Sequence, residues 1–247
     1  MTVSSEKERK ALEKIGKIVS IAREEMIKAV KPGITTKELD EIGGAVLSEF
    51  GATSAPKSEY NFPGITCISV NDQAAHGIPG PLMLKFGDMV NVDVSAELDG
   101  YFADTGATVV LDRDAALKNK LCDCSKAALM KSISRARAGC RLNLIGKTIY
   151  EEAQNNGFTV IKNLGGHGIG RRLHEDPAHI LNYYSKWDAR LMRSGLVLAV
   201  ETFLSTKAEY VTEAKDGWTL KTPDGSLVAQ FEHTIIVTDG EPIILTA

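Results

Sequence analysis

Apolar side chains recur at intervals of three to four residues in four segments of the chain. In residues 5–30 this spacing predicts an amphipathic helix that ends before Gly33. The apolar positions of this segment are Leu12, Ile15, Val19, Ala22, Met26 and Val30. Thr35 and Glu38 have the spacing of a capping box, which predicts a second helix from there to Phe50. The same pattern predicts helices over 114–138 and 143–156.

The strongest strand signal lies at residues 90–111, where valines alternate with polar residues. Within it, Asp99-Gly100 is typical of the two-residue turn of a β-hairpin. Such a turn places Ser95 opposite Asp104 and makes Asp93 and Asp104 diagonal neighbours on one face, with Cα atoms ~7–8 Å apart. Residues 66–70 are a further predicted strand. Segments 55–64 and 71–80 contain glycine and proline and are expected to be irregular.

Asp93 and Asp104 interrupt strands that are otherwise apolar. Two ionised carboxylates so placed are unstable without positive charge nearby, and a bound metal ion would supply it. The alternative is that one of the two aspartates caps a turn or faces solvent. For an isolated hairpin this alternative is preferred.

The second half of the chain repeats the order of the first, with a long helix, a shorter helix and a strand hairpin. The same separation of flanking glycines marks the shorter helix of each half: Gly33 and Gly51, then Gly139 and Gly157. We interpret the chain as a single domain built from a duplicated helix–helix–hairpin unit, with halves at about 5–111 and 114–247. Chance resemblance between ordinary helix–strand units is the alternative.

The duplication predicts carboxylates in the second half that match those of the first. Gly87 is followed by a mainly apolar stretch and, six positions later, by Asp93. Gly195 is followed in the same way by Glu201. Glu232 interrupts an apolar strand as Asp104 does. His167 lies in a glycine-rich segment that lacks the spacing of a nucleotide-binding fingerprint. Alone it would be interpreted as a structural histidine, but with four carboxylates available a site of five ligands explains it better.

Four carboxylates and one imidazole offer too many ligands for one zinc ion, which usually takes four. Two divalent cations fit better, with carboxylates bridging them, and ligands of this type suit manganese, iron(II), cobalt or zinc. Two such ions ~3.5–4 Å apart bind and deprotonate a bridging water and polarise a carbonyl group, as in aminopeptidases.

Composition and charge exclude several classes of partner. The chain has 43% hydrophobic and 25% charged residues and a net charge of −3, which gives no reason to expect nucleic acid or an anionic membrane as partner. The four cysteines lack the spacing of a zinc site or of a disulfide framework. The first residues are polar and charged, unlike a signal peptide, and no apolar run reaches membrane-spanning length. A soluble, cytoplasmic protein is expected.

The pattern of candidate ligands resembles the type I methionine aminopeptidases over essentially the whole chain. The matching motifs are Asp93, its spacing to Asp104, Gly-His167-Gly-Ile-Gly, Glu201 and Gln-Phe-Glu232-His-Thr. The resemblance implies an α+β "pita-bread" fold, in which helices cover an antiparallel sheet with pseudo-two-fold symmetry. It also implies that Asp93 binds one metal ion, that His167 and Glu201 bind the other, and that Asp104 and Glu232 bridge both. Glu201 then also accepts the proton of the bridging water.

By the same resemblance, two further histidines complete the site. His76, in His-Gly-Ile-Pro, corresponds to the histidine that contacts substrate and helps to stabilise the tetrahedral intermediate. His174 corresponds to the one that hydrogen-bonds the scissile carbonyl oxygen. Taken alone, either histidine is explained equally well as a loop cap. His179 and His233 are expected to have structural or supporting roles only.

The side-chain pocket for methionine is the least specific part of the resemblance. Four residues occupy positions that line the pocket in the family: Tyr60, Phe62, Cys67 and Trp218. Each of them also fits an ordinary core. The chain departs from the family pattern at Ala75, Leu173 and Thr202, where cysteine, an aromatic residue and proline are usual. These departures bear on the shape of the pocket and on its side-chain range.

The resemblance implies a bacterial-type monomeric enzyme that removes the initiator methionine from nascent proteins at the ribosome and prefers a small second residue. In the implied reaction, a metal-bridging hydroxide attacks the scissile carbonyl. A proline-directed aminopeptidase or prolidase shares the fold and metals but usually carries an additional N-terminal domain. A non-catalytic binding module of this fold would generally lack some of the five ligands. The short interval between His174 and Glu201 favours type I over type II.

Overall fold

The structure, a computed structural model, describes residues 1–112 and 114–247. Its helices are α1 (Glu6–Ala29), α2 (Thr36–Glu49), α3 (Ala55–Tyr60), α4 (Ala116–Ile133) and α5 (Asn143–Asn155). No helix among these residues is long and apolar enough to cross a membrane.

The strands of the described residues form three antiparallel sheets. The first joins β1 (Thr53–Ser54), β4 (Met89–Leu98) and β2 (Cys67–Val70), with β5 (Tyr101–Val110) also paired to β4. The second, small sheet joins β10 (Thr212–Glu213), β11 (Leu220–Lys221) and β3 (Gln73–Ala75). The third joins β13 (Ile243–Ile244), β12 (Val228–Ile236), β9 (Val197–Ser205), β7 (Gly165–Gly168) and β8 (Glu175–Leu181), with β6 (Thr159–Val160) also paired to β9.

Local signals in the sequence account for the elements of the first half. Ser5 caps α1, and Thr35 forms the predicted capping box with Glu38, whose side chain accepts from the Thr35 N–H at 2.8 Å. Asp99 and Gly100 have φ of 54° and 77°, as a two-residue turn with both residues left-handed requires. The predicted β4–β5 hairpin is thereby confirmed.

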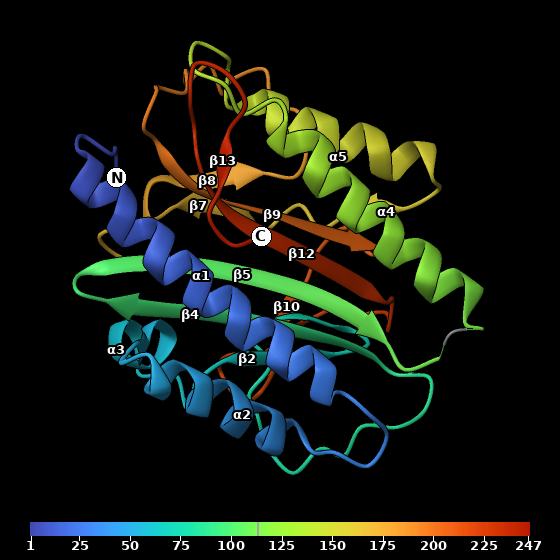
Figure 1. Ribbon diagram of the computed structural model, residues 1–247. Coiled ribbons are helices and arrows are strands. Elements are labelled where there is room, and N and C mark those ends of the chain that lie inside the picture. Colours follow the sequence, from blue (N-terminus) through green and yellow to red (C-terminus); the bar gives the residue numbers. More distant parts are fainter. Residues whose placement is uncertain (113) are drawn as a thin grey trace.

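Two apolar cores lie beneath two pairs of helices. Helix α1, with α2 beside it, lies over β4 and β5, and α4, with α5 beside it, lies over β9 and β12 (Figure 1). The first core includes Ile15 and Met26, and the second includes Leu129 and Ile145. Burial of such an aliphatic side chain contributes about 1.5–3 kcal/mol, so these faces fix the helices to the sheets. The expected combination of antiparallel sheet and covering helices is confirmed.

The halves meet where β5 and β12 lie side by side, and threonine hydroxyls join these strands in place of a regular backbone ladder. The Thr234 hydroxyl accepts from the Asp104 N–H at 2.9 Å and donates to the Asp104 carbonyl at 2.8 Å. Thr108 does the same for Gln230, at 3.0 and 2.8 Å. We call this junction the threonine seam. The bonds are therefore reciprocal: Thr108 of the first half holds the backbone of the second half, and Thr234 of the second half holds the backbone of the first.

Three predictions of local structure were wrong. Residues 55–60 are helical rather than irregular, since Ser54 caps α3 and Pro56 fits its first turn. Six residues are too few to display a helical period, which is why the pattern missed them. Residues 73–75 form a short strand inside the expected loop 71–80, and the helix expected to reach 138 ends at Ile133.

Thr234→Val should lower the free energy of unfolding by about 2–3 kcal/mol, because it leaves the buried N–H and C=O of Asp104 unpaired while keeping the side chain's shape. Urea denaturation measures the change. Thr53→Val is the matched control, since the Thr53 hydroxyl donates to Glu97 on the surface, and the change there should stay within about 0.5 kcal/mol. Equal effects of the two substitutions would contradict the importance given to the seam.

Candidate metal centre and active site

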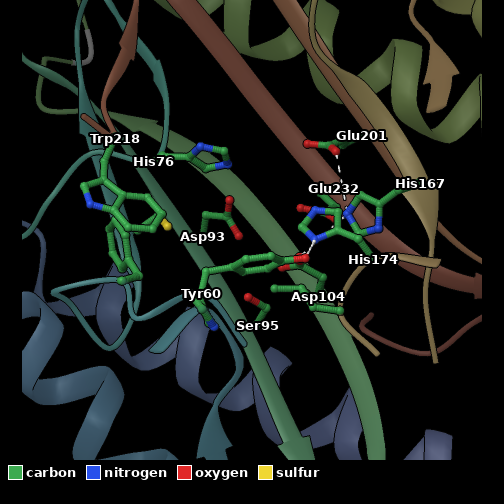
Figure 2. Close-up of a pocket in the computed structure, with 14 residues that line it drawn as sticks. Tyr60, His76, Asp93, Ser95, Asp104, His167, His174, Glu201, Trp218 and Glu232 are labelled. Atoms are coloured by element: carbon green, nitrogen blue, oxygen red, sulfur yellow. Dashed lines mark hydrogen bonds and ion pairs between the residues drawn. The ribbon is translucent and has the colours of Figure 1, made fainter. Parts of the chain in front are cut away.

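Five of the predicted side chains point into one cavity of about 310 Å³. Each comes from a different strand, and they are Asp93 on β4, Asp104 on β5, His167 on β7, Glu201 on β9 and Glu232 on β12 (Figure 2). The strands come from both halves of the chain, so the cavity lies where the halves meet.

Strand register determines how the five side chains converge. Ser95 pairs with Asp104 in the β4–β5 ladder, so Asp93 and Asp104 are the diagonal neighbours that the two-residue turn predicts. Glu201 and Glu232 are directly paired in the β9–β12 ladder. Ligand atoms of Asp104, His167 and Glu232 lie within 4.8 Å of one another. The His167 Nε2 atom is 3.9 Å from Glu201 Oε1 and 4.0 Å from Asp104 Oδ2.

His167 is oriented by the backbone of its own strand, β7. Its Nδ1 atom lies 3.0 Å from the Gly168 carbonyl, and a carbonyl can only accept, so Nδ1 carries the proton and Nε2 presents its lone pair to the carboxylates. Burial lowers the pKa of His167 to about 3, which keeps the ring neutral. The flanking glycines allow close packing of strands. A Cβ on Gly166 would lie 2.3 Å from the Ala199 carbonyl oxygen.

The four carboxylates destabilise one another's charge. Burial raises the pKa of Asp93, Glu201 and Glu232 well above the usual values, and repulsion from Asp104 adds to this effect. Burial also raises the pKa of Asp104, to about 6. At neutral pH the group therefore gains from any positive charge placed among its oxygens.

Two buried oxygens indicate where that charge fits. Asp104 Oδ1 and Glu232 Oε1 have no hydrogen-bond donor among the described residues. Buried polar atoms of this kind need an explanation, and oxygen atoms beside a neutral imidazole lone pair are suitable ligands for divalent cations. Cys67 also lines the cavity, but burial and the neighbouring Asp93 raise the pKa of its thiol, so it offers no thiolate.

Two residues that were not predicted from the sequence orient Glu232. The Gln230 side chain donates from Nε2 to Glu232 Oε2 at 3.0 Å, and Asn91 donates to Gln230 Oε1 at 2.7 Å. A Cβ on Gly106 would lie 2.1 Å from Gln230, so the glycine makes room for this amide. The alternation of side chains between the two faces of a strand could have identified Gln230 and Asn91. Gln230, Glu232 and Thr234 share one face of β12, as Asn91, Asp93 and Ser95 share one face of β4.

The two additional histidines lie at the cavity and are more exposed than the ligand set. His76 follows β3 with a left-handed φ of 54°, an uncommon conformation for a residue other than glycine. His174 lies against His167, with ring centroids 4.1 Å apart. Desolvation lowers the pKa of His174 to about 4. Both histidines line the cavity together with the five predicted ligands.

The apolar side of the cavity is formed by the residues expected in the methionine pocket. Phe62 and Trp218 meet edge to face, with centroids 5.2 Å apart. Cys67 and Tyr60 complete this wall, and Leu173 lines the cavity where the family has an aromatic residue. Ala75 is buried in the small sheet, as the last residue of β3.

The remaining residues singled out by sequence lie outside the ligand set. Thr202, at the position where proline is usual, is buried. Its hydroxyl shares a 2.8 Å hydrogen bond with the hydroxyl of Ser125 on α4. His233 Nδ1 lies 2.8 Å from the Thr246 hydroxyl, on the C-terminal segment. His179 lines an adjoining cavity of about 230 Å³.

Comparisons with known proteins agree with this geometry. Residues 10–239 match the model of metallopeptidase family M24. Methionine aminopeptidase 2 of Bacillus subtilis is 56% identical over 247 residues, which are 100% of this chain and 99% of that protein. The crystal structure of methionine aminopeptidase from Thermotoga maritima gives a TM-score of 0.95 at 34% identity, covering 100% of this chain and 99% of that one.

A prolidase structure is a more distant neighbour. Prolidase from Pyrococcus furiosus gives a TM-score of 0.78 at 19% identity. The superposition covers 100% of this chain and 65% of the prolidase. Likeness at this level concerns the fold alone. The expected pita-bread fold is confirmed by the methionine aminopeptidase structures.

The cavity carboxylates should make the metal-free protein less stable as pH rises. A carboxyl whose pKa is raised by folding binds its proton more tightly in the folded state, so its stabilising proton is lost as pH passes through the folded value. For Asp104 that value is about 6. Asp104→Asn lacks this titrating group. Between pH 5 and pH 8, the free energy of unfolding of the metal-free wild type should therefore fall by at least about 1 kcal/mol more than that of metal-free Asp104→Asn.

Denaturation of chelator-treated protein at the two pH values measures this difference. Asp99→Asn, an exposed carboxyl at the tip of the same hairpin, is the control and should track the wild type. A gap between Asp104→Asn and wild type that stays constant with pH would mean that the Asp104 pKa is not raised.

Proposed function

Because this chain belongs to metallopeptidase family M24 and, within it, to the methionine aminopeptidases, we propose that its five converging side chains hold the divalent cations used to remove N-terminal methionine. The family implies divalent metal ions. The observation that carries the assignment is the pair of buried, unpartnered oxygens on Asp104 and Glu232, close to the His167 lone pair. The donor set suits manganese, iron(II), cobalt or zinc.

Each ligand has a distinct place in this proposal. Asp93 would hold one cation, His167 and Glu201 would hold the other, and Asp104 and Glu232, at the junction of the two halves, would serve both. Once bound, the cations supply Lewis acidity toward a carbonyl oxygen and bring the pKa of a water molecule toward neutrality. The carboxyl groups of the site must release their protons before a cation binds.

The chain's own residues then orient the substrate and move its protons. Glu201 accepts a proton from the attacking water, and the β9–β12 ladder sets its backbone directly opposite Glu232. His174 donates to the oxygen of the scissile carbonyl as negative charge develops there. A donor so placed contributes about 3 kcal/mol to lowering the barrier. His76 lies across the cavity from His174 (Figure 2), and it contacts the substrate from that side.

Substrate selection follows from the walls of the cavity. Phe62, Trp218 and Cys67 offer aromatic and sulfur surfaces to the flexible methionine thioether. Tyr60 and His174 stand at the rim that the remaining peptide must pass, which favours a small second residue. We propose that the substrates are the N-termini of nascent chains emerging from the ribosome in the cytoplasm, and that the protein acts as a monomer.

A peptide panel tests this function. Protein reconstituted with Mn²⁺ or Co²⁺ should cleave Met-Ala-Ser at least about 100-fold more efficiently, by kcat/KM, than Met-Leu-Ser, since a misfit at the second residue costs about 3 kcal/mol. Ala-Pro should remain uncleaved, because the pocket is built for an unbranched thioether. Liquid chromatography of released methionine measures the rates.

Paired variants identify the site responsible. Glu232→Gln should bring Met-Ala-Ser cleavage to background, whereas Asp99→Asn on the hairpin tip should retain it. Preferential cleavage of Ala-Pro would favour a prolidase instead. Full activity of Glu232→Gln would contradict the assigned ligand set.

A further inference from the structure

Two adjacent residues of α3 contact the loop between β7 and β8 across the cavity rim. The Tyr60 hydroxyl lies 2.7 Å from His174 Nδ1, and the two rings meet edge to face at 5.5 Å. The preceding residue, Glu59, pairs with Arg172 Nε at 3.2 Å. In Figure 2 the Tyr60 ring reaches across the cavity, with its hydroxyl directed at His174.

The hydrogen bond to Tyr60 constrains the position of the His174 proton. A neutral imidazole carries one N–H and one lone pair, and the partner of one nitrogen determines the state of the other. A phenol is a stronger hydrogen-bond donor than an imidazole N–H, and an imidazole nitrogen is a stronger acceptor than a phenol oxygen. The Tyr60 hydroxyl therefore donates and Nδ1 accepts.

We propose that Tyr60 is a positioning residue, whose hydroxyl holds the His174 proton on Nε2, the nitrogen left free to donate to the substrate. This inference rests on the proposed function, in which His174 donates to the scissile carbonyl oxygen. Burial raises the pKa of Tyr60, so the hydroxyl keeps its proton through the neutral range.

The position of the proton matters most when charge develops on the carbonyl oxygen. In the other tautomer, Nε2 would present a lone pair to that oxygen and repel it. Without the Tyr60 hydroxyl nothing excludes the Nδ1–H tautomer, so both tautomers are populated, and the ring loses one of its anchors. An interaction realised mainly in the transition state affects kcat more than KM.

Tyr60→Phe removes the hydroxyl and keeps the ring. Two-bond ¹H–¹⁵N spectra of metal-free protein should show His174 as the Nε2–H tautomer in the wild type and as a mixture in Tyr60→Phe. His174→Gln assigns the signals. With Mn²⁺ and Met-Ala-Ser, kcat of Tyr60→Phe should fall about tenfold, the worth of one hydrogen bond, while KM stays within about twofold.

Tyr101→Phe is the matched control. It also deletes a tyrosine hydroxyl bonded to this loop, because Tyr101 accepts from Arg171 Nη2 at 2.8 Å. It should leave the His174 spectrum unchanged and kcat within about twofold of wild type. If anchoring of the loop were the whole role, Tyr101→Phe and Tyr60→Phe would have equal effects, and the proposal would be wrong.

The spectra separate this inference from the proposed function. An Nδ1–H tautomer in the wild type, or identical His174 spectra in the wild type and Tyr60→Phe, would overturn the role of Tyr60. A tautomer change in a chain that cleaves no methionyl peptide would support that role and contradict the proposed function instead.

Discussion

Four carboxylates facing one another around a buried cavity are the constraint on which this molecule depends. Asp104 and Glu232 are almost fully buried, and the other three carboxylates each raise the cost of ionising Glu232. A fold built only for stability would fill this space with apolar side chains. Divalent cations would turn the repulsion into binding energy, and this is the physical reason for the link between fold and metallopeptidase activity.

The threonine seam is how the fold brings the carboxylates together. At the seam, hydroxyls of Thr108 and Thr234 hold the backbone of the opposite strand, so Asp104 and Glu232 face each other from two separate sheets. Each half supplies one of these threonines and one of these carboxylates. The reciprocity is what a duplicated unit folded onto itself would give, and it places the chemistry at the junction rather than inside either half.

The sequence was sufficient to predict the long helices, the hairpin register and the convergence of Asp93 and Asp104, because period and turn chemistry are local. The convergence of Glu201 and Glu232 with them needed the duplication and the family resemblance, since pairing between β9 and β12 is a long-range property. Helix α3 was missed because six residues carry no period. The contacts of Tyr60 with His174 and of Asn91 with Gln230 join residues far apart in the chain, and no local rule pairs them.

The most direct test of the account is a titration of chelator-treated protein with Mn²⁺ under anaerobic conditions at pH 7, by calorimetry in two buffers of different ionisation enthalpy. Two ions should bind per chain, with protons released because carboxyl groups of raised pKa must lose their protons first. Glu232→Gln should lose at least one of the two ions. Binding of no ion, or of ions without proton release, would contradict the claim that these buried carboxylates form the metal site.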